Sequence, residues 1–168
     1  MIIDIHTHVF PDHLAERAVA TLSAVSKVPA HSDGTCEGLR YSQQAAGIDL
    51  SVIAPIATKP SQARAINAWA AGVNREYDDL ICFGSIHPGQ QDWQEEIARL
   101  VADGIRGVKF HPDYQDFFVD EPRLLPIYRA LADARLIVLS MPGWISACRP
   151  PCTARRRGWR RCSITCPS

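Results

Sequence analysis

The sequence predicts an α/β fold built on a parallel sheet. Over the first 140 of its 168 residues, short apolar runs alternate with segments whose apolar residues recur at helical spacing. The links between these segments are short. Strands and helices that alternate in this way favour parallel strands joined by right-handed crossovers. We therefore expect about five strands, most of them followed by a helix.

The first strand is expected at Ile2–Ile5, where an apolar run interrupted only by Asp4 is typical of a strand covered on both faces. A helix should follow from a cap at Asp12 to about Val25. Its apolar positions, which we expect to face the core, are Leu14, Ala18, Leu22 and Val25. Residues 26–34 have the composition of a loop.

The remaining elements follow the same rhythm. A second helix is expected at 35–46, ended by Gly47, and a third from a cap at Ser61 to about Tyr77. A fourth should run from a capping box at Asp92 and Glu95 to Gly104, and a fifth from Asp120 to about Leu131. Strands are expected at 48–57, 80–86, 105–110 and 135–140. In such a fold, functional side chains gather where the strands end.

His6 and His8 come directly after the first strand. Side chains two apart on an extended segment point the same way, so both imidazoles should face one spot. Neutral imidazole is a good ligand for zinc and other transition metals. Asp4 shares their parity and is expected to orient one of them. His87, Lys109 and His111 fall at the ends of later strands.

Asp4-x-His6-x-His8 after a first strand resembles the opening of the amidohydrolase superfamily of metal-dependent barrels. The segment 104–112, Gly-Ile-Arg-Gly-Val-Lys-Phe-His-Pro, resembles the fourth strand of its amidohydrolase-related branch, which includes aminocarboxymuconate-semialdehyde decarboxylase. The resemblance covers residues 1 to about 140. It implies a partial (β/α)8 TIM barrel of about the first five strands, since a complete barrel needs ~250 residues.

The resemblance also implies a chemistry. Relatives of this kind hydrolyse C–N or C–O bonds or decarboxylate small carboxylic acids with a divalent metal, often zinc, that activates water. It implies that His6 and His8 are metal ligands, that Lys109 lines the site as a cation, and that His111 contacts the small-molecule substrate. A further ligand from strand five and an aspartate base from strand eight have no counterpart, so we expect this chain to be inactive or nearly so.

The composition changes sharply after Ser140. Residues 1–140 hold 12 basic and all 18 acidic residues, a net charge of −6, whereas residues 141–168 hold six arginines and no acid, a net charge of +6. Four of the six cysteines lie in this last segment: Cys148, Cys152, Cys162 and Cys166. Spacing alone would allow a zinc site, and the arginines with Trp159 would allow nucleic-acid contact.

A change of reading frame explains the segment 141–168 better than either site. Arginine, cysteine, proline and tryptophan are frequent when a GC-rich gene is read out of frame. In the shifted frame, each new codon combines the third base of one codon with the first two bases of the next. The genetic code then permits an amino-acid sequence that begins His-Ala-Gly and has apolar residues at helical spacing. We therefore predict two parts: an incomplete barrel domain at 1–140 and an aberrant, disordered, non-native tail at 141–168. Resequencing the gene around codon 140 tests this hypothesis.

The other expectations follow from composition. No apolar run approaches the ~20 residues of a membrane span, and no basic region precedes the first apolar residues as in a signal peptide. We expect a cytoplasmic protein that binds neither membranes nor nucleic acid. The open edge of an incomplete sheet predicts self-association. The alternative to an enzyme is a non-catalytic half-barrel that serves as a binding or assembly module.

Overall fold

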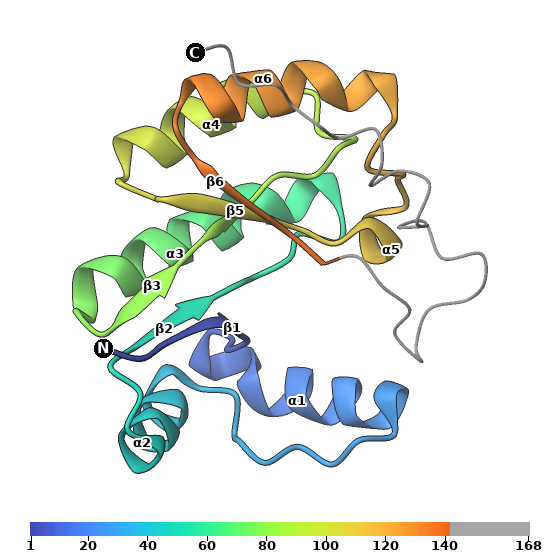
Figure 1. Cartoon of the computed structure of the whole chain (residues 1–168). Helices are drawn as coiled ribbons and strands as arrows, with labels where there is room; N and C mark the ends of the chain where they lie inside the picture. Colours follow the sequence, from blue (N-terminus) through green and yellow to red (C-terminus); the bar gives the residue numbers. More distant parts are fainter. Residues whose placement is uncertain (142–168) are drawn as a thin grey trace.

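The computed structural model describes residues 1–141, which form one curved layer of parallel strands with helices packed along one side (Figure 1). The strands are β1 (Ile3–Thr7), β2 (Leu50–Ile53), β3 (Leu80–Cys82), β4 (Gly84–Ser85), β5 (Gly107–Phe110) and β6 (Ile137–Ser140). The helices are α1 (Asp12–Ser26), α2 (Cys36–Ala46), α3 (Ala63–Glu76), α4 (Trp93–Ala102), α5 (Pro112–Gln115) and α6 (Leu125–Asp133), with 3-10 turns at Pro60–Gln62 and Pro122–Leu124. The predicted α/β fold with a parallel sheet is confirmed.

All neighbouring strands are parallel, in the order β1-β2-β3 and β4-β5-β6. β3 and β4 are the two halves of the single strand expected at 80–86, interrupted at Phe83. The Phe83 N–H still donates to the Ile53 carbonyl at 2.9 Å, so β2 continues to pair across the break. With β3 and β4 counted as one, these strands form five consecutive parallel strands of a barrel wall.

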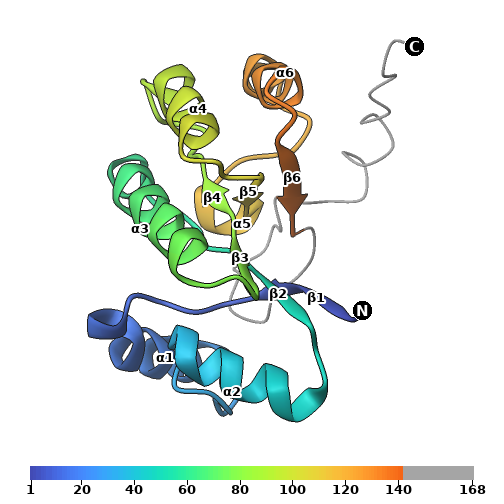
Figure 2. The same cartoon turned by 90° about the vertical axis from the view of Figure 1, so that its left-hand side faces the viewer.

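Helices α3, α4 and α6 cover the outer face of this wall (Figure 2). The main core lies between them and β2 to β5, where Ile53, Leu80, Leu100 and Val108 have 2% or less of their surface exposed. Burying side chains of this size from water is the dominant favourable term in folding. This layer therefore holds the strand ends, and the side chains on them, in fixed positions.

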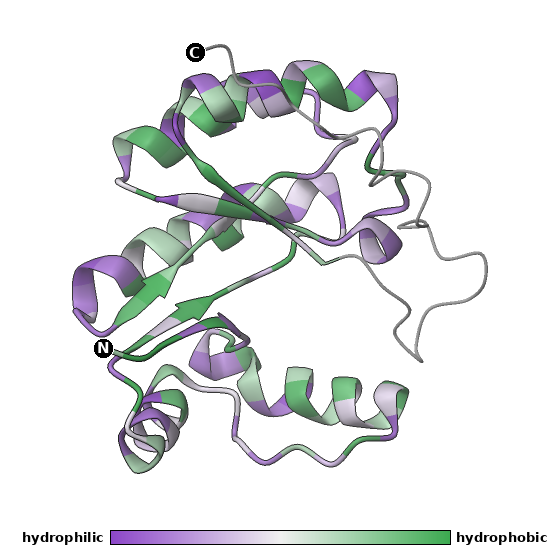
Figure 3. Ribbon diagram, viewed as in Figure 1, coloured by the Kyte–Doolittle hydropathy of each residue, from purple (hydrophilic) through white to green (hydrophobic). Residues whose placement is uncertain are grey.

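β1 and β6 are the two edges of the wall in the described part of the chain. The prediction that the first strand is covered on both faces is wrong, because 42% of Ile3 and 63% of Ile5 are exposed. β6 is similarly open, with Ile137 at 59% and Val138 at 42%. Figure 3 shows apolar residues along both edge strands as well as in the core. The apolar pattern of β1 is that of a strand inside a closed barrel.

Gly47 is confirmed as the C-cap of α2, whereas the side-chain caps predicted at Asp12, Ser61 and Asp92 do not form. The Thr35 hydroxyl accepts from the Gly38 N–H and begins α2, and Gly47 ends it at φ 68°. By contrast, α1 begins at Asp12 itself, Ser61 lies in the 3-10 turn before α3, and Asp92 makes no capping hydrogen bond to α4. Asp92 does occupy the N-cap position of α4, but its carboxylate faces Arg99 at 3.4 Å.

The apolar stripe expected to pack α1 on the core is largely open. Leu14, Leu22 and Val25 are 46%, 44% and 54% exposed, and Ala15 is the buried residue of the helix. Val101 of α4 is also 50% exposed. No helix in residues 1–141 is long and apolar enough to cross a membrane.

Candidate functional site

The two predicted metal ligands lie together at the C-terminal end of β1. The rings of His6 and His8 have their centroids 4.9 Å apart and meet edge to face. The pairing with β2 shifts between Asp4 and Thr7, which gives β1 an irregularity next to His6. Bulges of this kind re-aim side chains and are frequent beside active sites. The relative position of the His6 and His8 rings is thus determined by the local geometry of β1 at its C-terminal end.

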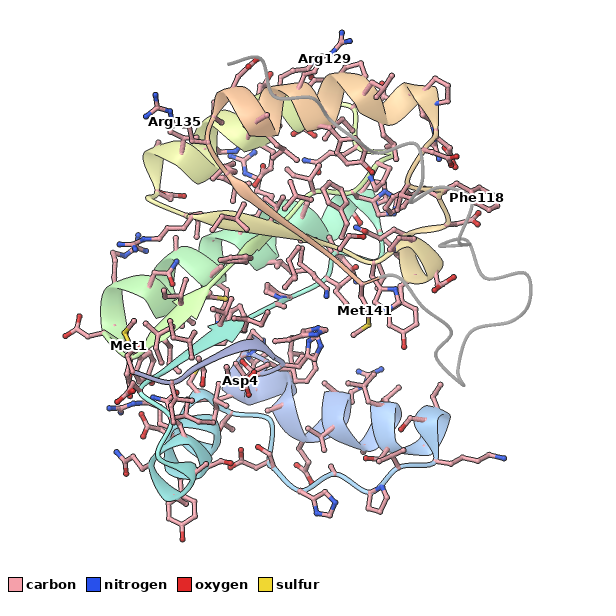
Figure 4. The ribbon with its side chains drawn as sticks, viewed as in Figure 1. Met1, Asp4, Phe118, Arg129, Arg135 and Met141 are labelled. Carbon is pink, nitrogen blue, oxygen red and sulfur yellow. The ribbon has the colours of Figure 1, made fainter. Side chains whose placement is uncertain are left out.

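Asp4 acts on the backbone rather than on an imidazole. Its Oδ1 accepts a hydrogen bond from the His6 N–H at 3.1 Å. The expectation that it orients a histidine ring is therefore replaced by a different role, in which it holds the irregular turn of β1. Figure 4 labels Asp4 on β1, together with Met141 just beyond β6.

Lys109, on β5, reaches the same spot from across the wall. It has no exposed surface, and its Nζ lies 3.0 Å from Nε2 of His6. Burial lowers the pKa of Lys109 to about 8. The amine still carries its proton for most of the time at neutral pH, so a positive charge lies directly beside the His6 ring.

His111 ends β5 and is 2% exposed. Its Nδ1 accepts from the Tyr114 N–H at 3.4 Å, and its ring stacks on that of Tyr114 with centroids 4.1 Å apart. A neutral imidazole that accepts at Nδ1 carries its proton on Nε2. This Nε2 is buried without a hydrogen-bond partner in the described residues. It is therefore a free donor at the end of a strand.

Gln115 is a residue of the site that the sequence reasoning missed. Its side chain accepts from the His111 N–H at 2.9 Å and donates to the carbonyls of Ala57 and Ile86 at 2.9 and 3.0 Å. These groups follow β5, β2 and β4, so one amide ties three strand ends together. The dipeptide His111-Pro112 could have indicated this contact. Proline favours the first turn of a helix, and the short helix α5 that begins at Pro112 carries Gln115.

His87 does not join this group. Its Nδ1 accepts from the Gly89 N–H at 3.0 Å, and the residue does not line the cavity beside the other histidines. Of the side chains expected at strand ends, the structure thus brings together His6, His8, Lys109 and His111 and leaves His87 apart.

The electrostatics of the group favour neutral imidazoles. Burial is the largest cause of a lowered pKa at His6, His8 and His111, and Lys109 adds a like charge nearby. The pKa of His8 falls to about 4. Neutral imidazole has the free lone pair that a metal ion needs. A metal ion would displace no proton from His8 near pH 7.

The His6 and His8 rings fit two positions of a divalent metal site. Residues 1–141 contain no cluster of three or more histidine, cysteine or carboxylate side chains that could complete it. Structural and catalytic zinc sites usually have three or four protein ligands. The described residues therefore supply part of a donor set.

A family model described as amidohydrolase matches residues 3–160, nearly the whole chain. The chain belongs to the amidohydrolase family. The predicted resemblance is confirmed by this match. Among curated proteins, none matches the sequence.

Solved structures share the fold of this amidohydrolase. The apo form of Metarhizium anisopliae IDCase has a TM-score of 0.67 at 18% identity and aligns with 86% of this chain and 51% of its own. 5-Carboxyvanillate decarboxylase from Novosphingobium aromaticivorans, a D314N mutant with bound manganese and 3-methoxy-4-hydroxy-5-nitrobenzoic acid, has a TM-score of 0.65 at 18% identity, with 85% and 51% covered. A putative amidohydrolase from Staphylococcus aureus has a TM-score of 0.58 at 12% identity, with 84% and 47% covered.

The chain spans about half the length of these solved structures. The predicted partial barrel is confirmed by this coverage together with the five parallel strands, β3 and β4 counted as one. The predicted boundary at residue 140 and the frame hypothesis fall at the end of the described residues, and the cysteines and arginines of 142–168 lie outside them.

Proposed function

We propose that this chain carries the first half of a metal-dependent amidohydrolase site that acts on a small carboxylic acid by hydrolysis or decarboxylation. The observation that supports it is the convergence of His6, His8, Lys109 and the free donor of His111 at the ends of β1 and β5. The bound manganese and aromatic acid of one solved relative are consistent with this assignment.

In this proposal His6 and His8 hold a divalent metal, with zinc or manganese as candidates. When bound, the metal supplies a Lewis acid that polarises oxygen ligands and makes water a better nucleophile at neutral pH. His111 donates from Nε2 to the substrate carboxylate. Lys109 adds a positive charge that favours an anionic substrate. Gln115 fixes the strand end that carries His111.

Because residues 1–141 supply two imidazoles and no further ligand beside them, we infer that the chain turns over slowly or not at all. Two imidazoles hold a divalent ion weakly compared with three or four ligands. The exposed edges β1 and β6 favour a second candidate function, a half-barrel that acts as a binding or assembly module. The two candidates differ in whether the His pair retains a metal.

Metal retention tests the assignment. The chain is loaded with Zn²⁺ or Mn²⁺, dialysed, and analysed by inductively coupled plasma mass spectrometry. His6→Ala with His8→Ala should reduce retained metal at least about tenfold, the scale of loss expected for altered metal sites. His31→Ala, at an exposed loop position, is the matched control.

Three outcomes separate the alternatives. Equal retention by the double variant and the parent chain overturns the metal site. A cooperative thermal transition without retained metal supports the binding module. Release of carbon dioxide or hydrolysis product that disappears with His6→Ala contradicts the inferred inactivity while supporting the metal site.

A further inference from the structure

A cavity of about 810 Å³ opens beside the histidine group, between α1, α3 and the residue after β6. His8, His111 and Met141, which Figure 4 labels just beyond β6, are among its lining residues. Leu14 and Leu22 of α1 and Ile66 and Trp69 of α3 line it as well. The cavity therefore has a polar end at the strand termini and an apolar body between two helices.

The polar end is built to receive an acceptor. His111 is 2% exposed, and its Nε2–H has no partner among the described residues. A buried donor without a partner is unfavourable, and a ligand acceptor would remove that cost. The lining contains three histidines and no aspartate, glutamate, lysine or arginine. An anionic oxygen thus meets a donor there and no opposing charge from the lining.

The cavity as a whole is larger than a one-ring acid needs. Its volume of about 810 Å³ lies in the upper part of the ~300–1,000 Å³ range of pockets that hold drug-sized ligands. Two residues of the α1 stripe that we expected in the core, Leu14 and Leu22, line this space instead and are 46% and 44% exposed. Apolar surface of this kind gains free energy when a ligand covers it.

We propose that this cavity binds a monocarboxylic acid with an extended apolar body. The carboxylate accepts from Nε2 of His111, and the body lies between Leu14 and Leu22 of α1 and Ile66 and Trp69 of α3. The inference rests on the proposed function, because it names the class of substrate that the same site takes. It adds an apolar subsite between α1 and α3 to the groups at the strand ends.

Isothermal titration calorimetry on the full chain in EDTA tests this with three probes: benzoate, biphenyl-4-carboxylate and biphenyl-4-carboxamide. Biphenyl-4-carboxylate should bind at least about tenfold more tightly than benzoate, because a second ring buries more apolar area. The carboxamide should bind more weakly than the acid of the same shape, since charge-assisted hydrogen bonds are the stronger ones.

Two variants of α1 provide the matched comparison. Leu22→Glu places a carboxylate on the cavity wall at a half-exposed position, so it should abolish the advantage of biphenyl-4-carboxylate and leave benzoate binding unchanged. Val25→Glu adds the same charge to the same helix at a position outside the lining, and should change neither affinity. Circular dichroism confirms that both variants keep the helix.

The proposal is overturned if no acid binds, if benzoate and biphenyl-4-carboxylate bind equally, if the amide equals the acid, or if the two variants behave alike. Its failure is distinct from failure of the metal site. Loss of the metal site alone leaves acid binding in EDTA intact. Loss of the apolar subsite alone leaves metal retention by His6 and His8 intact.

Discussion

The Lys109 side chain is fully buried in the strand layer, and its amine lies next to His6. Its folded pKa of about 8 lies below the ~10.4 of a free lysine. The unfolded chain therefore binds more protons between these values, so the contribution of this residue to stability rises with pH across that window. Below about pH 8 its burial costs the full amount, roughly 3 kcal/mol at 1.36 kcal/mol per pKa unit.

Lys109→Met should remove this dependence. We expect urea unfolding in EDTA to show the parent chain gaining stability between pH 7 and pH 10 relative to the variant. The difference between the two profiles is the measured quantity, because other groups titrate in both chains. Profiles that stay parallel would show that the amine is not buried as its contacts indicate.

Gln115 should be the most sensitive polar residue near the site. Gln115→Ala removes one acceptor and the donors to two carbonyls. Each buried group left without a partner costs about 1–3 kcal/mol, so the expected loss of unfolding free energy is at least that amount. Gln44→Ala, at an exposed position of α2, should change stability by less than about 0.5 kcal/mol. A loss no greater than that of the control contradicts the role of Gln115.

Four of the five residues that the sequence predicted at the strand ends meet there, with His87 as the exception, but the sequence did not predict how they are held. His6, His8, Lys109 and His111 were found because strand ends in parallel sheets share one edge. The irregularity in β1 and the backbone role of Asp4 depend on local backbone geometry. Two of the three contacts of Gln115 reach carbonyls 29 and 58 residues away. Periodicity carries no information on such contacts.

At the scale of elements, Gly107 sets the distance between β5 and its neighbours. A Cβ there would lie 2.6 Å from the Phe83 ring and 2.8 Å from the Ile137 carbonyl oxygen. Gly107→Ala should destabilise the chain by about 1–3 kcal/mol, the usual cost of overpacking. Gly72→Ala in α3 meets nothing within 4 Å and should be neutral or stabilising by up to about 1 kcal/mol. Thermal denaturation of both variants measures the contrast, and equal effects contradict it.

Elements were predicted well where the signal is local. α2 begins and ends near the predicted residues, because the Thr35 hydroxyl and the left-handed Gly47 both act within one turn. Asp92 reaches the predicted N-cap position of α4, but its carboxylate faces Arg99 and makes no capping hydrogen bond. The stripe of α1 was correctly found as a helical face, yet the sequence could not show that it lines a cavity rather than the core.

At the scale of the whole molecule, the edges β1 and β6 expose the apolar side chains of Ile3, Ile5, Ile137 and Val138. The pattern of β1 predicted burial, and that burial needs a neighbour beyond residues 1–141. An exposed strand edge pairs readily with another chain. Strand β6 of one copy can pair with β1 of a second copy. A twofold axis parallel to the barrel axis then pairs β6 of the second copy with β1 of the first, and the two copies close a ring of parallel strands.

We therefore expect the 168-residue chain to self-associate, with the mean mass in sedimentation velocity rising with concentration. Ile5→Lys on one edge and Val138→Lys on the other should each shift the chain toward monomer, because burying an unpaired ammonium in an interface is costly. Tyr41→Lys, 78% exposed on α2, adds the same charge away from both edges and should leave association unchanged. Pairing of β1 with β6 requires both edge variants to act. An effect of Val138→Lys alone would indicate contact between two β6 strands, and an effect of neither would place any association elsewhere.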